Sequence, residues 1–333
     1  MTPRCPPLWL EPLALPGGRV LPGRVLPGPM EGITGGSFCT VMTRLGLVSA
    51  WMTPFIRVSE NIPRAARIRD RLRAFSPLPV VVQVMGTDIP VLAAAAARLA
   101  LEPGVVGIDL NCACPTPIVV SNGGGGGRLR HPAWILAALV ALRRACPKVG
   151  ISVKLRAGLH SEDELPRICE AVREGRPDFV VLHYRTVKEG YGPAPNALRR
   201  LARAREWLAD VALFGSGDLY TVEDAARMFD AAAVDGLTPA RGLVANPWLV
   251  RDIESDCRRD IVPDRTEGER RDFLRELVGE AERTGTWRRG FVLELARHLF
   301  GRSHPLFDQL LTADSAAGMM AALAEDDRER HDG

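Results

Sequence analysis

The sequence predicts an α/β protein: a (β/α)8 TIM barrel followed by a small all-α C-terminal domain. Eight short apolar segments, rich in β-branched residues, alternate with helical patterns over about 230 residues, as the elements of a barrel do. After residue 247 only helical patterns continue. An open doubly wound sheet has the same alternation, but it carries a G-x-G-x-x-G turn after its first strand. Here Gly-Pro-Met-Glu-Gly occupies residues 28–32 instead, which favours the barrel.

Each expected strand is a short apolar run that is bounded by turn-forming residues. In chain order the expected strands are Arg24–Gly28, Leu47–Thr53, Val80–Met85, Gly107–Asn111, Ser152–Arg156, Phe179–His183, Ala212–Gly215 and Gly236–Ala240. The segments between them have the apolar spacing of helices. The expected helices are Pro90–Leu101, Pro132–Ala145, Glu162–Arg173, Ala197–Ala209 and Thr221–Asp230. Thr221 and Asp224 form the start signal of the last one, a capping residue followed by an acid in the first turn.

The pattern divides the chain into four parts. They are an N-terminal extension over residues 1–19, the barrel over 20–252, a helical domain over 266–324 and a charged tail over 325–333. The helical domain is expected to contain Glu269–Thr284, Arg289–Phe300 and Pro305–Leu323, with a break near Asp314. Arg-Val-Leu-Pro-Gly occurs twice in succession at the barrel entrance, over 19–23 and 24–28.

Composition excludes several classes of protein. With 46% hydrophobic residues the chain can bury a sizeable core, so it is not disordered, and a net charge of +3 does not by itself indicate nucleic acid. Seven cysteines are scattered without a C-x-x-C pair, which excludes the usual zinc motif and a disulfide framework and favours a reducing compartment. The start lacks a signal-peptide pattern, and no apolar run approaches the roughly 20 residues of a membrane span. We therefore expect a cytoplasmic monomer without a metal or a membrane partner.

Asn-Cys-Ala-Cys-Pro over residues 111–115 follows one expected strand and precedes the glycine run Gly123–Gly127. A cysteine alone is often a buried small hydrophobe, and glycines often only make turns. However, chemistry-bearing residues follow every expected strand, and in a barrel those ends face one active site. In chain order they are Pro29, Met30, Glu31, Arg57, Gln83, Asn111, Cys114, Lys154, Arg156, His183, Gly215, Ser216, Gly217, Asp218, Ala240 and Arg241. Together they predict a catalytic centre.

The last two strand ends predict a phosphate site. Gly-Ser-Gly-Asp over 215–218 and Ala-Arg-Gly over 240–242 are glycine-bearing turns before helices, where barrels often hold phosphate through backbone N–H groups. Arg241 adds a cation. The amides of Gln83 and Asn111 and the ammonium of Lys154 suit a planar heterocycle with carbonyls and ring nitrogens. Flavin mononucleotide (FMN) fits both ends of such a site.

The strand-end motifs, taken in order, resemble those of the tRNA-dihydrouridine synthases over residues 25–252. The matching segments are Gly28–Thr34, Val82–Gly86, Asp109–Pro115, Gly123–Gly127, Val153–Arg156, His183–Thr186, Gly190–Tyr191, Gly215–Asp218, Ala240–Gly242 and Asn246–Trp248. The resemblance implies a barrel that binds FMN, takes hydride from NADPH and reduces the C5=C6 bond of a uridine in tRNA. Phe55–Val58 and the Asn-Cys-x-Cys-Pro form are similar to the bacterial C-type branch, which acts at uridine 16 of the D-loop.

The resemblance also implies residue roles. FMN would be held by Pro29, Met30, Glu31, Gln83, Lys154, His183, Gly215, Ser216, Gly217, Ala240 and Arg241. Cys114 would donate the proton, Arg57, Asn111 and Tyr191 would meet RNA, and the C-terminal helices would bind tRNA phosphates. Ala240 and Ser216 depart from the family's usual glycine and asparagine, and Glu294 and Ala296 stand where the C-type branch has basic residues.

Two alternatives follow from the same residues. One is an FMN-dependent barrel oxidoreductase acting on a small molecule, which would reduce free uracil or orotate. The other is an RNA-binding homologue that has lost catalysis, which would purify colourless even with added FMN.

The positions of the two cysteines distinguish their expected roles. Because Pro115 cannot donate to a strand ladder, the strand is expected to end by Cys114, which places Cys114 on the loop and Cys112 in the packed interior.

Overall fold

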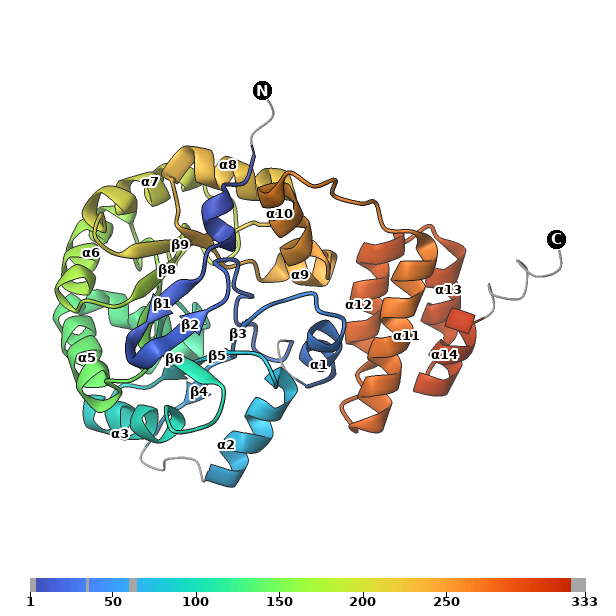
Figure 1. Ribbon diagram of the computed structural model, residues 1–333, viewed down its shortest axis with the longest axis horizontal. Helices are drawn as coiled ribbons and strands as arrows, with labels where there is room; N and C mark the ends of the chain where they lie inside the picture. The colour runs from blue at the N-terminus through green and yellow to red at the C-terminus, as the bar shows by residue number, and fades with distance from the viewer. Residues whose placement is uncertain (1–3, 34–35, 60–64, 325–333) are drawn as a thin grey trace.

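The computed structural model describes residues 4–33, 36–59 and 65–324. The expected charged tail, 325–333, and Thr34 of the first motif lie outside these residues. The chain begins with a short antiparallel hairpin of β1 (Leu13–Leu15) and β2 (Arg19–Leu21). A curled parallel sheet follows, with helices around it and a helical region on one side (Figure 1).

The sheet runs in chain order from β3 to β10. Its strands are β3 (Trp51–Met52), β5 (Val80–Met85), β6 (Val105–Cys112), β7 (Gly150–Arg156), β8 (Phe179–His183), β9 (Ala212–Ser216) and β10 (Gly236–Leu237), while β4 (Ile56–Arg57) pairs with the end of β5. Every pairing in this sheet is parallel. The first expected strand, 24–28, is reduced to a bridge between Val25 and Leu237, and the N–H of Gly28 donates to the carbonyl of Pro239. These contacts bring the start of the barrel against β10.

Helices cover the outside of the sheet at the expected places. They are α3 (Ile89–Leu99), α5 (Pro132–Ala145), α6 (Leu165–Glu174), α7 (Ala197–Trp207) and α8 (Val222–Ala232). Thr221 and Asp224 form the capping box that starts α8. Sequence reasoning missed α1 (Gly36–Arg44), α2 (Ala65–Leu72), α4 (Pro117–Ser121), α9 (Arg241–Ala245) and α10 (Leu249–Arg258). With helices around a curled parallel sheet, the predicted barrel fold is confirmed.

The barrel interior changes from apolar at one end to polar at the other. Along β8, Phe179, Val181 and His183 share a face because alternate residues of a strand point the same way. Phe179 packs on Phe214 of β9 with ring centroids 5.0 Å apart. Leu15 and Leu21 of the hairpin join the same buried cluster. The hairpin therefore closes the apolar end, and the polar end is left for the site.

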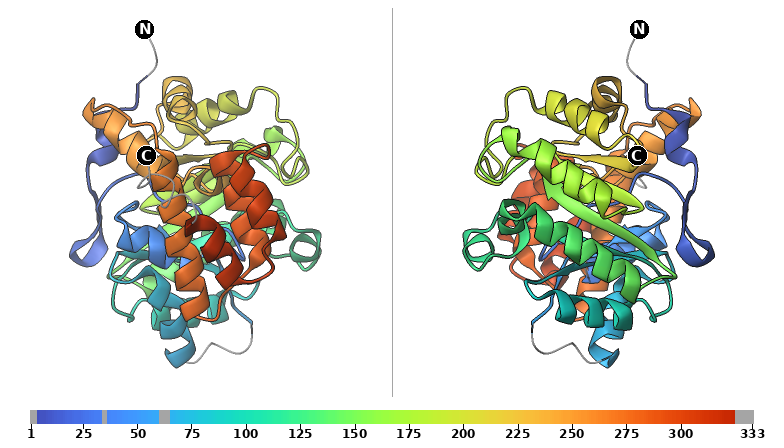
Figure 2. Two further views of the ribbon diagram at one scale, coloured as in Figure 1. Left: turned by 90° about the vertical axis from the view of Figure 1, so that its right-hand side faces the viewer. Right: turned by 90° about the vertical axis from the view of Figure 1, so that its left-hand side faces the viewer.

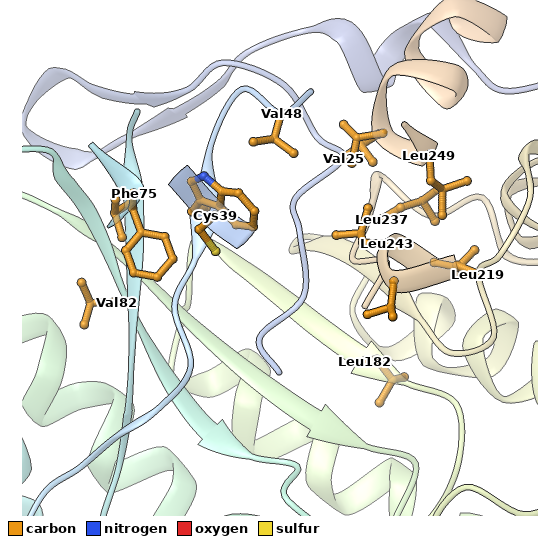
Figure 3. Packing of buried hydrophobic residues seen from close by; sticks show 14 of the residues in the cluster. Val25, Cys39, Val48, Phe75, Val82, Leu182, Leu219, Leu237, Leu243 and Leu249 are labelled. Atoms are coloured by element: carbon orange, nitrogen blue, oxygen red, sulfur yellow. The ribbon is translucent and has the colours of Figure 1, made fainter. Parts of the chain in front are cut away.

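The duplicated Arg-Val-Leu-Pro-Gly gives two different structures. The first copy forms β2, and the second supplies Val25 and Leu26, both buried. Figure 3 shows Val25 beside Leu237 and Leu249 in the packing between the sheet and the following helices. Since β2 begins at Arg19, the hairpin crosses the expected boundary between extension and barrel.

The C-terminal region has four helices among the described residues, with a break where it was expected. They are α11 (Glu267–Arg283), α12 (Arg289–Phe300), α13 (Pro305–Thr312) and α14 (Ala316–Ala324). The four gather on one side of the barrel, next to α1 (Figures 1 and 2). Phe38 of α1 meets the edges of Phe273 and Phe291, with centroids 6.5 and 5.6 Å away. The helical region thus shares a continuous core with the barrel. In the described part of the chain, no helix combines the length and apolar character that crossing a bilayer requires.

Candidate active site

The polar end of the barrel brings the expected strand-end residues together. Asn111 of β6 pairs in register with Lys154 of β7, and Arg156 pairs with His183 of β8. His183 in turn pairs with Ser216 of β9. These side chains occupy adjacent positions on the inner face of a parallel sheet, so the structure gathers them at one mouth.

A buried hydrogen-bond chain begins at Asp109, a residue that sequence reasoning did not assign. Its Oδ1 accepts from the hydroxyl of Ser152 at 2.7 Å, and its Oδ2 accepts from Nε2 of Gln83 at 2.8 Å. Burial raises the pKa of Asp109 to about 6, so at neutral pH the carboxylate is ionised and can only accept. This acceptor fixes the amide of Gln83, whose Oε1 then faces Asn111 and accepts from its Nδ2 at 2.6 Å.

The chain ends at the cysteine loop. With Nδ2 committed to Gln83, the Oδ1 of Asn111 accepts from the backbone N–H groups of Ala113, at 3.1 Å, and Cys114, at 3.0 Å. We name the series Ser152–Asp109–Gln83–Asn111 the amide relay. It holds the backbone turn that carries Cys114 out of β6. Asp109 could have been found from sequence, because it stands two residues before Asn111 and so shares its inward face.

The two cysteines of the motif lie in different surroundings. Cys112 is the last residue of β6 and is fully buried, and burial raises the pKa of its thiol. Cys114 lies beyond the strand, is half-buried, and its thiol donates to the hydroxyl of Thr116 at 3.4 Å. The expectation that the strand ends before Cys114 is confirmed. The other six cysteines are all buried, so a surface reagent meets Cys114 first.

Asp109→Asn is expected to raise the rate at which iodoacetamide alkylates Cys114, by about tenfold. Asparagine can present its NH2 to Gln83 and reverse the amide relay, so the loop loses hydrogen bonds worth about 0.5–1.5 kcal/mol each, and 1.4 kcal/mol corresponds to tenfold. Ser152→Ala is the control, because it keeps the acceptor of Gln83. Equal alkylation rates in wild type and Asp109→Asn, measured by mass spectrometry of intact protein, would show that the relay does not hold the loop.

Arg156 joins the cysteine loop to the loop after β8. Its Nε donates to the carbonyl of Ala113 at 2.9 Å, and its Nη1 donates to the carbonyls of Thr186 and Gly190 at 3.0 and 2.7 Å. Its guanidinium lies 5.4 Å from the ring centroid of Tyr191, which is 60% exposed. The buried guanidinium of Arg156 therefore contacts the exposed ring of Tyr191 and helps to hold it in place. Arg57 is exposed on β4.

Lys154 and His183 present hydrogen-bond donors at the mouth. Nδ1 of His183 accepts from the N–H of Arg185 at 3.2 Å, so the neutral ring carries its proton on Nε2. Burial, with Lys154 and three arginines nearby, keeps the pKa of His183 well below its usual range. Burial, reinforced by Arg156, lowers the pKa of Lys154 to about 8. Among the described residues, the half-buried Lys154 ammonium has no hydrogen-bond partner.

The charged side chains of the expected phosphate turn already have partners, which the sequence did not suggest. Asp218 accepts two hydrogen bonds from Arg185, at 2.9 and 2.6 Å, and a third from Arg241 at 2.7 Å. Arg241 also lies 4.7 Å from the ring centroid of Tyr191. The cation expected to serve phosphate alone is thus shared with a carboxylate and an aromatic ring.

The glycines of this turn are required by packing. A Cβ on Gly215 would lie 2.3 Å from Sδ of Met228, and one on Gly217 would lie 2.0 Å from the Tyr184 ring. Ser216 between them donates to the carbonyl of Thr238 at 3.2 Å. Ala240 stands directly before α9.

The residues expected to hold FMN fit a phosphate-bearing, carbonyl-rich heterocycle. Pro29, Met30 and Glu31 follow Gly28, where a Cβ would lie 3.0 Å from that of Ala240, so they adjoin the phosphate turn. The unpaired Lys154 ammonium and the Nε2–H of His183 are donors without acceptors among the described residues. Gln83 and Asn111, by contrast, are committed to the amide relay. Their roles toward FMN and RNA stay predictions.

A cavity of about 520 Å³ adjoins Glu31 between the barrel and the helical region. Its walls are formed by apolar residues of both parts and by two acids and two cations, Glu31, Asp70, Arg71 and Arg288. Arg288 also donates to the carbonyl of Gly32. The cavity reaches the barrel at Glu31, Thr53 and Ile56, and neither Cys114 nor Lys154 lines it.

The fold is an α/β barrel, and the match to a family of reductive enzymes makes the protein an oxidoreductase. The chain belongs to the dihydrouridine synthase family, because the family profile "Dihydrouridine synthase (Dus)" matches residues 26–304. The chain is 34% identical to a tRNA-dihydrouridine(16) synthase of Pseudomonas putida, over 66% of this chain and 70% of that protein. It is 26% identical to the enzyme with the same description from Neisseria meningitidis serogroup B, over 92% of this chain and 95% of that protein.

Solved structures share the fold at low identity. The structure described as TcOYE with pHBA superposes with a TM-score of 0.55 at 11% identity, covering 75% of this chain and 93% of that chain. A 2-naphthoyl-CoA reductase complex gives a TM-score of 0.57 at 11% identity, over 76% and 53% of the two chains. These likenesses support the barrel fold.

Proposed function

We propose that this protein is a tRNA-dihydrouridine synthase that uses FMN and NADPH to reduce the C5=C6 bond of a D-loop uridine, uridine 16, in tRNA. The observation that carries the proposal is the loop thiol of Cys114, held by the amide relay at a mouth that offers unpaired donors. Membership of the family, and relatives described as tRNA-dihydrouridine(16) synthases, support the substrate and the position.

The placement of the chain's own residues supports the following roles. FMN, when bound, supplies the hydride that adds to C6 of the uracil ring. Cys114 then donates its proton to C5, as a general acid does, and Asn111 keeps the loop of Cys114 in place. The Lys154 ammonium and the neutral His183 serve as donors to the cofactor. The exposed ring of Tyr191 offers a stacking surface for an unstacked base.

FMN would be held by the residues that line the mouth and the turn before α9. The assignment comprises Pro29, Met30, Glu31, Gln83, Lys154, His183, Gly215, Ser216, Gly217, Ala240 and Arg241. RNA would meet Arg57, Asn111 and Tyr191, and the C-terminal helices would contribute phosphate contacts. A monomer in the cytoplasm suits an enzyme that acts on free tRNA.

Mass-spectrometric mapping of dihydrouridine in tRNA and rRNA from a deletion strain tests the proposal. We expect the loss of dihydrouridine 16 alone, restored by the wild-type gene. Unchanged tRNA and rRNA would contradict the proposal. Reduction of free uracil or orotate by the purified protein would favour the small-molecule oxidoreductase, and protein that stays colourless with added FMN would favour the non-catalytic RNA-binding homologue.

The affinity for FMN is expected to fall as pH rises above about 8. A ring that accepts hydrogen bonds from Lys154 favours its ammonium form, but in the free protein the pKa of Lys154 is lowered to about 8. Above that pH binding must take up a proton, and the Kd should rise by up to tenfold per pH unit as long as Lys154 stays protonated in the complex. Titration by flavin fluorescence tests this, with Lys154→Met expected to bind weakly and to flatten the profile. Lys148→Met, which removes an exposed lysine, is the control. A Kd that does not change from pH 8 to 10 in wild type would place Lys154 away from the ligand.

A further inference from the structure

One long segment of the chain is free of acidic residues. Residues 110–161 contain seven lysines and arginines and no aspartate or glutamate, although the whole chain has 40 acidic residues. The segment includes the loop of Cys114, α4, the short helix Gly125–Arg130 and α5. Its charge therefore favours an anionic ligand on the side of the mouth that carries the cysteine.

Among the cations of this segment, Arg128 has unusual surroundings. Its guanidinium lies 4.2 Å from the ring centroid of Trp134, and its Nε is buried without a hydrogen-bond partner. In the described part of the chain, no hydrogen bond or ion pair is made by this side chain. Desolvation lowers the pKa of Arg128, yet a guanidinium stays charged in a protein.

Other buried or partly buried arginines of the barrel have polar partners, which for Arg156 are backbone carbonyls and for two others are carboxylates. Arg143 of α5 pairs with Asp178 at 2.6 Å, and Arg200 of α7 pairs with Glu189 at 2.7 Å. Asp88 follows Thr87, whose carbonyl accepts from Trp134. Its side chain already has a partner, because it accepts from the N–H of Val91 and caps α3. The buried Nε–H of Arg128 costs free energy as long as it has no acceptor. The charge of Arg128 is therefore available to pair with an anion.

The position of Arg128 on the molecule limits which anions can bind to it. Nε1 of Trp134 donates to the carbonyl of Thr87, in the loop after β5, so the stack stands on the rim at the carboxyl ends of the strands. Arg128 interacts electrostatically with Cys112, whose side chain points to the opposite face of β6 from Asn111. The guanidinium thus lies outside the ring of inward-facing residues. A ligand that reaches both Cys114 and Arg128 must extend across the rim.

We propose that Arg128, held against the ring of Trp134, binds a phosphodiester of the substrate RNA on the side of the barrel mouth opposite α11–α14. The inference rests on the proposed function, because it takes RNA as the substrate. Figures 1 and 2 show α5 and the C-terminal helices on opposite sides of the barrel. The RNA would accordingly be gripped on both sides of the mouth.

Salt dependence of tRNA binding tests the proposal with the full-length, flavin-loaded protein. Loss of one phosphate contact reduces the slope of log K against log salt by about 0.7–1. We expect Arg128→Ala to show this reduction and roughly tenfold weaker binding near 0.15 M KCl, measured by fluorescence anisotropy with tRNA. Arg144→Ala, which removes an exposed arginine from the far end of α5, makes the same change in net charge and should leave the slope unchanged.

Arg128→Lys keeps a charge at the rim and should retain the wild-type slope, which separates a lost contact from a misfolded protein. An unchanged slope in Arg128→Ala, with wild-type protein that binds and modifies tRNA, would overturn the inference and leave the proposed function intact. An unchanged slope with a raised KM for NADPH would overturn it in favour of a phosphate of the reductant. Wild-type protein that neither binds nor modifies tRNA would overturn the proposed function itself.

Discussion

Replacing Cys114 with alanine is expected to slow uridine reduction by about 10²–10⁴-fold, the usual contribution of a general acid. FMN binding and its reduction by NADPH should persist, because Cys114 lies on a loop beyond β6 and none of the proposed cofactor ligands depends on its thiol. The measurement is single-turnover oxidation of the reduced flavin by tRNA under anaerobic conditions. It isolates the half-reaction in which the uracil receives both its hydride and its proton.

Cys112→Ala is the matched control, since the two cysteines are separated by one residue. Cys112 is fully buried and packs in the main hydrophobic cluster, so its replacement should lower stability modestly and leave the oxidation rate near that of wild type. The opposite pattern, a slow Cys112→Ala and an unaffected Cys114→Ala, would reverse the two roles.

Replacing Phe273 with alanine is expected to lower the free energy of unfolding by about 3–5 kcal/mol, as truncation of a buried phenylalanine usually does. Phe273 of α11 is 1% exposed. Its ring meets Phe38 of α1 edge-on and lies 5.4 Å from the centroid of Trp248. The cavity would therefore open between the barrel and the helical region.

Urea unfolding followed by tryptophan fluorescence and circular dichroism measures this effect. Leu311→Ala is the control, because Leu311 is 43% exposed in α13 and its truncation should change stability by no more than about 0.5 kcal/mol. One cooperative transition that moves to lower urea in Phe273→Ala would show that the two parts unfold together. Two separate transitions, only one of them shifted, would show that the helical region is an independent unit and can be removed without unfolding the barrel.

Elements with strong local signals were predictable. The bounds of α5, α12 and β5 coincide with those expected from apolar spacing and β-branched runs. The capping box of Thr221 and Asp224 starts α8 as expected. The first strand was not predicted correctly, since Arg24–Gly28 is held by a bridge and a few hydrogen bonds to the β10 side. Short helices such as α4 and α9 were missed because five residues contain too little of the helical period to be read.

The site likewise has a part that could be predicted from the sequence and a part that could not. That Cys114, Lys154 and His183 meet at one mouth follows from strand ends alone, because parallel strands place their carboxyl ends at the same edge. The amide relay does not follow from any local pattern. Gln83 and Asp109 are 26 residues apart, and Asp109 and Ser152 are 43 apart. The ion pair of Arg241 with Asp218 is likewise a contact between separate strand ends.

Periodicity and capping are properties of neighbouring residues, so the order of the elements, the barrel, the helical region and the residue types at the mouth could be predicted from the sequence. Which of those residues already have partners could not. In the folded chain Gln83 binds Asp109, Asn111 binds Gln83, and Arg241 is shared with Asp218. In the part of the chain that the structure describes, Lys154 and Arg128 have no hydrogen-bond or ion-pair partner. These contacts depend on distances between strands, and such distances exist only once the chain has folded.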